Sequence, residues 1–273
     1  MNRHKDYKEK TSDLYMNLGW NKRGQVAIFV IIAIVIVAVI LVIFLRPRLG
    51  FTTTQGFSPE KYLGDCIEPN LRDNINKIAS QGGYYNPEGF VVYNSTKVKY
   101  LCYTSQYYKT CMVQQPKLRE HFEGEIDSLI KPKVEQCAMN LKAEYERQGY
   151  AVSLSQAEES ISIVPGNIRI NVIAPITITK ESSQNFRSFK VNIKSEMYDL
   201  IMTSVSIIDY ESTYGDSETT LYMQYYPDLK IEKTKLSDGT TIYVLTNVIS
   251  KESFTFASRS LAWPPGYGIE EVQ

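Results

Sequence analysis

Four cysteines, Cys66, Cys102, Cys111 and Cys137, are the residues whose type and spacing indicate a defined chemistry. An even number of cysteines can form two disulfide bonds, and three pairings are possible. Cys102 and Cys111 flank eight residues rich in tyrosine and polar side chains, which favours a local bridge. That bridge leaves Cys66 to pair with Cys137, each on an amphipathic helix. Zinc-binding cysteines usually lie about two to four residues apart, and no pair here is that close. We therefore expect two disulfides in an oxidising compartment and no metal site.

The other residue types that serve in catalysis form no recognisable pattern. The chain has two histidines, His4 and His121, and His121 lies in a charged segment typical of a solvated helix face. Adjacent acids at 158–159 and 270–271 are typical of solvating pairs. The sequence contains neither a phosphate-binding loop nor a Gly-x-Ser-x-Gly nucleophile motif. We predict no enzyme activity and no cofactor. An envelope hydrolase, whose two carboxylates would meet only in the fold, is kept as an alternative.

Tyrosine is the residue type whose abundance stands out, with twenty in the chain and doublets at 84–85, 107–108 and 225–226. Tyrosine forms strands well and is also enriched at contact surfaces. We favour ring packing over sheets and turns. The sharper alternative is a surface that recognises other surface proteins, a polysaccharide or the chain's own subunits. The zero formal net charge gives no reason to expect a nucleic-acid partner. Asn94 opens the sequon Asn94-Ser95-Thr96 and is a candidate glycosylation site if this part is exported.

Residues Val26 to Leu45 form an unbroken run of twenty apolar side chains. As a helix this run would extend about 30 Å, the thickness of one hydrocarbon core, so we predict a transmembrane helix over 25–45. Basic residues outnumber acidic ones in the leader, 1–24, and two arginines alone follow the run closely. This asymmetry favours a single-pass protein of the cell membrane with its N-terminus in the cytoplasm and its C-terminal domain outside. The lipid bilayer is thus the first expected partner.

The junction Lys22-Arg23-Gly24-Gln25, directly before the apolar run, resembles the class III (type IV prepilin-like) signal of archaeal surface proteins. In that family a membrane peptidase cleaves after the glycine, so the resemblance implies processing between Gly24 and Gln25. The mature helix would then serve as anchor and assembly core of a pilin-like subunit. One position departs from the pattern, because the fifth mature residue would be Phe29, where pilins commonly carry a glutamate. An uncleaved signal anchor is the other interpretation of the junction.

A second resemblance extends along the chain. Asp65-Cys66-Ile67 opens a helical stretch that ends in Gln81-Gly82-Gly83-Tyr84, and a later helix with Cys137 ends in Arg147-Gln148-Gly149-Tyr150. These segments resemble those of uncharacterised single-span archaeal surface proteins that share the Lys-Arg-Gly-Gln start. The resemblance implies a surface location and supplies no activity.

Composition shifts divide the part after the span. A stalk at 46–57 leads into an extracytoplasmic α+β domain over 58–262. Within this domain we expect a helical, disulfide-linked part at 58–149 and a β-rich part at 150–262. A loose tail follows at 263–273.

Apolar residues at helical spacing predict two helical regions before residue 150. Ser58 can cap the first, which should kink at Pro69 and stop at the Gly82-Gly83 pair. Gly124 and Pro132 should divide the second.

From Tyr150 onward the apolar period changes to two, which predicts an antiparallel meander with one wet face. The best candidate to cover its buried face is a helix over Ser195–Tyr210. A final hairpin at 229–235 and 240–248 turns through Ser237-Asp238-Gly239, and 253–260 adds a last strand. The expected fold class is therefore α+β, with an N-terminal transmembrane helix, a helical region, and an antiparallel β meander with a covering helix.

Overall fold

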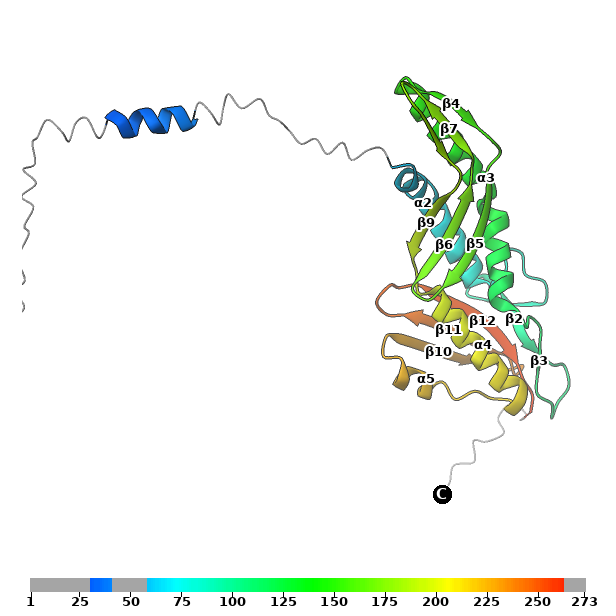
Figure 1. Ribbon diagram of the computed structural model, residues 1–273. Helices are drawn as coiled ribbons and strands as arrows, with labels where there is room; N and C mark the ends of the chain where they lie inside the picture. The colour runs from blue at the N-terminus through cyan, green and yellow to red at the C-terminus, as the bar shows by residue number, and fades with distance from the viewer. Residues whose placement is uncertain (1–29, 41–57, 263–273) are drawn as a thin grey trace, which may run out of the picture. The chain divides into compact units, whose positions relative to one another are not determined.

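The computed structural model describes residues 30–40 and 58–262 of the chain. Contacts divide the chain into two units, Met1–Gly56 and Phe57–Gln273, which are described separately (Figure 1). In the first unit, residues 30–40 form a helix whose apolar side chains are exposed, such as Ile34 at 61 %. Among the described residues, no helix combines the length and the apolar character that a bilayer crossing requires.

Several sequence predictions concern residues outside the described ranges. These are the leader 1–24, the cleavage site at Gly24 and Gln25, both ends of the span from Val26 to Leu45, the stalk 46–57 and the tail 263–273.

Two long helices, α2 (Pro59–Ser80) and α3 (Leu118–Arg147), run side by side in opposite directions in the second unit (Figure 1). Ser58 caps α2 as predicted, because its hydroxyl accepts a hydrogen bond from the Lys61 N–H at 3.3 Å. A disulfide between Cys66 and Cys137 joins the two helices, with their Cα atoms 6.0 Å apart. The covalent bond therefore fixes the register of α2 against α3.

The prediction that Gly124 and Pro132 divide the second helical region is wrong, because α3 continues through both. Pro69 lies inside α2, within the helix predicted from Ser58 to the Gly82-Gly83 pair. Both prolines are exposed, so water can reach the carbonyl groups that lose their N–H partner. Buried residues continue on both sides of Pro132, as Ile130 and Val134 show, so both halves of α3 pack into the core.

An antiparallel meander follows α3. Each of its three extended segments is interrupted, so the meander consists of six strands in two short three-stranded sheets. Its strands are β4 (Ala151–Leu154), β5 (Glu158–Val164), β6 (Asn167–Ile173), β7 (Ile176–Thr179), β8 (Ser183–Phe186) and β9 (Phe189–Lys194). They pair in the orders β4-β7-β8 and β5-β6-β9. The predicted period of two is confirmed, since Ile168, Ile170 and Val172 of β6 are buried while Arg169 is exposed.

Within residues 58–262 a larger sheet of six strands joins segments from both ends of the domain (Figure 1). It is called the second sheet below, to distinguish it from the two short sheets of the meander. Its strands are β1 (Phe90–Tyr93), β2 (Thr96–Tyr103), β3 (Met112–Val113), β10 (Leu229–Lys235), β11 (Thr241–Asn247) and β12 (Ser253–Arg259). The order is β1-β2-β12-β11-β10, and β3 pairs with β2. The predicted final hairpin and last strand are confirmed as β10, β11 and β12. β2 and β12 run parallel, so residues on both sides of position 150 share this sheet.

The covering helix was predicted for the wrong sheet. The observed helix, α4 (Met197–Tyr214), contacts β11, β12 and β2 of the second sheet, while α2 and α3 cover the meander through β9, β4 and β5. Glu252, next to β12, holds the start of α4: its carboxylate accepts hydrogen bonds from Ser195 Oγ at 2.7 Å and from the Glu196 N–H at 2.6 Å. These bonds join the start of α4 to the segment that leads into β12. The short helix α5 (Thr220–Tyr225) follows α4.

The long helices and the second sheet share one hydrophobic core. Phe122 of α3 lies 6.0 Å from Phe254 of β12 between ring centroids, and Tyr243 of β11 stacks on Phe256 at 5.0 Å. These rings connect the helical and the β-rich parts of the domain.

Replacing both cysteines of the inter-helix disulfide, Cys66→Ala with Cys137→Ala, should lower the free energy of unfolding by about 4 kcal/mol, because the bond closes a loop with a sequence separation of 71. Replacing Cys102 and Cys111 should cost less through loop closure, about 3 kcal/mol, since their separation is 9. Urea unfolding followed by circular dichroism measures both. An unchanged unfolding free energy in the Cys66/Cys137 variant would contradict the account.

Candidate functional site

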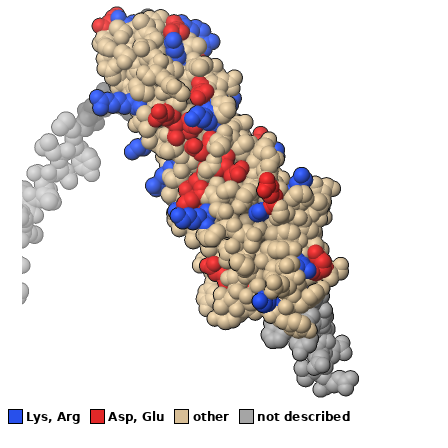
Figure 2. Space-filling model, turned by 90° about the vertical axis from the view of Figure 1, so that its right-hand side faces the viewer, with Lys and Arg blue, Asp and Glu red and all other residues tan. Residues whose placement is uncertain are grey.

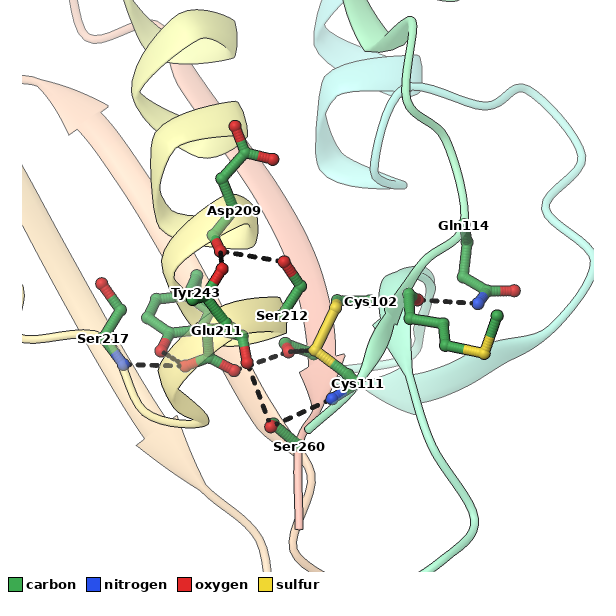
Figure 3. Close-up of a disulfide and its surroundings, with 12 residues drawn as sticks. Cys102, Cys111, Gln114, Asp209, Glu211, Ser212, Ser217, Tyr243 and Ser260 are labelled. Carbon is green, nitrogen blue, oxygen red and sulfur yellow. Dashed lines mark hydrogen bonds between the residues drawn. A yellow bond between two sulfur atoms is a disulfide. The ribbon is translucent and has the colours of Figure 1, made fainter. Parts of the chain in front are cut away.

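Side chains from β2, β12 and α4 meet around the Cys102–Cys111 disulfide in the interior of the domain (Figure 3). The two Cα atoms are 5.3 Å apart and both residues are buried. The Cys111 N–H donates to Ser260 Oγ at 3.2 Å, and Ser258 Oγ lies 3.7 Å from Cys111 Sγ. Together with Cys66–Cys137 this is the pairing expected from the sequence. Two such bonds indicate a domain that folds outside the cytoplasm.

Glu211 of α4 is a buried carboxyl group beside this disulfide, with 1 % of its surface exposed (Figure 3). Its Oε1 accepts hydrogen bonds from the Tyr243 hydroxyl and from the Ser217 N–H, the latter at 3.2 Å. Its Oε2 accepts one from the Ser258 hydroxyl at 2.7 Å. Burial raises the pKa of the Glu211 carboxyl, and the three hydrogen bonds oppose that rise. These hydrogen bonds connect α4 to β11 and β12, so the cluster has a structural role.

Glu211→Gln should change how stability depends on pH. The folded-state pKa of Glu211 lies above its ordinary value of about 4.5, so the native state holds its proton more tightly than the unfolded chain. The wild-type free energy of unfolding should therefore fall as pH rises through 4.5 toward the raised pKa. Tyr243 stays protonated, because burial raises its pKa. The negative charge of Asp216 also raises the pKa of Glu211.

Urea unfolding at a series of pH values measures this slope. Glu211→Gln should flatten it, whereas Glu181→Gln, a change at an exposed position, serves as the control. Equal slopes in the wild type and Glu211→Gln would contradict the prediction.

The other candidate residues from the sequence lie apart from this cluster. Asn94 and Ser95 form the two-residue turn between β1 and β2, with φ angles of 46° and 64°, and Asn94 is exposed. His121 is half-buried, contrary to the expected solvated position, because its ring packs 4.0 Å from that of Tyr84. Burial lowers the pKa of His121, and its Nε2 lies 3.7 Å from Glu125 Oε1. No group of three or more metal-ligating side chains is present among the described residues.

The adjacent acids at 158–159 differ from each other. Glu158 is exposed, but Glu159 is half-buried on β5. Burial raises the pKa of Glu159, and the negative charge of Asp127 on α3 raises it further, while Lys131 opposes the rise. The interpretation of this pair as purely solvating therefore holds for Glu158 alone.

A groove of about 390 Å³ lies between the first half of α4 and the segment that contains α5. Its volume is within the range of about 300–1,000 Å³ that is typical of small-molecule sites. The Ser206 and Tyr222 hydroxyls, 2.8 Å apart, connect α4 and α5 beside it. The residues whose chemistry defines the groove are Glu196, Asp199, Met202, Tyr222, Tyr226 and Asp228. Sequence reasoning identified the tyrosine doublet at 225–226 but not the acids, because Glu196 and Asp199 lie at the start of α4 whereas Asp228 follows α5.

Charges of both signs alternate on the face of the domain that Figure 2 shows, where blue lysines and arginines lie among red acids. This face presents no basic stripe of the kind that nucleic-acid-binding proteins carry.

Comparisons with protein-family models, with curated proteins and with solved structures find no match for this chain.

Proposed function

We propose that this chain is a membrane-anchored extracytoplasmic surface protein whose folded domain binds a partner or contributes to the structure of the cell envelope. The observation that carries the proposal is the pair of disulfides in a domain that follows an apolar run of twenty residues. Disulfides persist in oxidising compartments, and a run of this length matches a hydrocarbon core. The basic leader favours the orientation that puts the domain outside. The partner would be another surface protein, a polysaccharide or a second subunit, and we propose no cofactor or catalytic role.

The position of Asn94 would allow glycosylation in an exported domain. The residue is exposed at the tip of the β1–β2 hairpin, where an attached sugar would point into solvent without displacing a buried side chain. We therefore propose Asn94 as a glycan acceptor.

Protease added to intact cells should digest the domain over residues 58–262, because the proposed topology places it outside. An immunoblot against the domain measures its loss, and a cytoplasmic protein that survives the same treatment is the control for lysis. Non-reducing peptide mapping of the digest should recover both disulfides, and the peptide with Asn94 should carry added carbohydrate mass. Survival of the domain in intact cells, with digestion only after lysis, would refute the topology.

The alternative is a type IV pilin-like subunit that assembles through residues 26–45 after processing. The Lys22-Arg23-Gly24-Gln25 junction favours it, and it requires cleavage between Gly24 and Gln25.

Mass spectrometry of the mature N-terminus separates the two proposals. A chain that begins at Gln25 supports processing, and Gly24→Val should then block it, while Gly19→Val in the same leader should not. A mature chain that begins at or near Met1 removes the pilin-like alternative and leaves the uncleaved anchor.

A further inference from the structure

Charge is strongly segregated in one part of the folded domain. The 35 residues from Ser195 to Leu229, which include α4 and α5, contain no lysine or arginine. The same stretch contains the acids Glu196, Asp199, Asp209, Glu211, Asp216, Glu218 and Asp228. Glu211 is buried, and Asp216 is neutralised by Lys233 and Lys235 at 2.5 and 2.7 Å. The remaining five acids give the α4–α5 surface a negative potential although the whole chain is neutral.

Three of these acids line the groove between α4 and α5 and have no cationic partner. Within residues 58–262, the side chains of Glu196, Asp199 and Asp228 make no salt bridge and accept no hydrogen bond. Asp199 and Asp228 are exposed, and Glu196 is half-buried. The groove therefore holds carboxylates whose charge is balanced neither by the groove lining nor by the surrounding strands.

Large apolar side chains that face solvent occur in the groove lining, at Met202 and Tyr226, and elsewhere on α5, at Leu221 and Tyr225. Tyr225 and Tyr226 are exposed to 79 % and 60 %, Leu221 to 55 %, and Met202 of α4 to 40 %. Exposed aromatic and sulfur-containing side chains gathered around a concavity are typical of protein contact surfaces. The face of a tyrosine ring also attracts a cation, most strongly where water is excluded.

We infer that the groove between α4 and α5 binds a lysine or arginine side chain of a basic protein segment. The unpaired carboxylates of Asp199, Asp228 and Glu196 would meet the cationic head, and Met202, Tyr222 and Tyr226 would contact its aliphatic stem. This inference deepens the binding role of the proposed function and rests on that role, but it does not depend on the membrane anchor.

Two observations favour a protein segment over other cations and over sugars. Leu221 and Tyr225 are exposed on α5 outside the groove lining, and a protein segment, unlike a small cation, is long enough to contact them as well. A neutral sugar would leave three carboxylates without a counter-charge, and an acidic one would be repelled.

The test uses the full chain in detergent and a fluorescein-labelled peptide of alternating lysine and glycine, with fluorescence anisotropy as the readout. The wild type should bind this peptide, weaken as salt rises, and not bind a glutamate–glycine peptide of equal length. Asp199→Asn with Asp228→Asn should raise the Kd by about tenfold, the sum of two modest charge pairs. Asp73→Asn with Glu181→Gln removes the same net charge at exposed positions outside the groove and should leave the Kd within about twofold.

Tyr226→Ala tests the apolar contribution, because this exposed side chain can be removed without opening the core. It should weaken the peptide at high salt as well as at low salt. Equal weakening by both pairs of acid substitutions would show nonspecific attraction and overturn the inference, as would the absence of binding. Self-association of the wild type that Asp199→Asn with Asp228→Asn abolishes would assign the groove to a second copy instead. None of these three outcomes changes the protease result, so the proposed topology is judged separately.

Discussion

The packing of α2 against α3 is the interaction on which the rest of the domain depends. The two helices are far apart in sequence, and the bond between Cys66 and Cys137 holds them at one register. Their buried faces then cover the meander, with α2 on β9 and α3 on β4 and β5. Phe122 of α3 also contacts Phe254 of β12, so the same helix pair packs against the meander and against the second sheet. A change in the α2–α3 register would therefore disturb every layer of the domain at once.

Local periodicity predicted much of this fold, because it depends on neighbouring residues. The spacing of Ile168, Ile170 and Val172, the turn at 237–239 and the cap at Ser58 all encode their structures within a few residues. The start of α4 is instead held by Glu252, which lies more than fifty positions away and accepts hydrogen bonds from Ser195 and Glu196. No periodicity carries such a contact. The division of the second helix at Pro132 was mispredicted for a related reason, since the exposure of this proline favours its tolerance within a helix.

The candidate sites show the same division. The cysteine pairing followed from spacing and count, but the acidic groove is assembled from α4, α5 and the strands beside them, so its acids are dispersed in the sequence. Glu211 did carry a local signal. It continues the buried stripe of Leu200, Ser204, Ile207 and Ile208 along α4, a position where a carboxyl group requires hydrogen-bond donors. Its donors come from β11, β12 and the loop after α4, which a single helix pattern does not reveal.

The parallel pairing of β2 with β12 constrains the order in which the domain can be completed. A ribosome releases the chain from its N-terminus, so β2 emerges about 150 residues before the strand that must lie beside it. The β1–β2 hairpin and the α2–α3 pair can form early, but one side of β2 keeps unpaired backbone groups until β12 arrives. Because β11 and β10 add beyond β12, the last-made segment closes the centre of the sheet rather than its edge. Nascent chains that stall before residue 253 would hence retain an open strand edge in the middle of the domain, a form that invites aggregation and degradation.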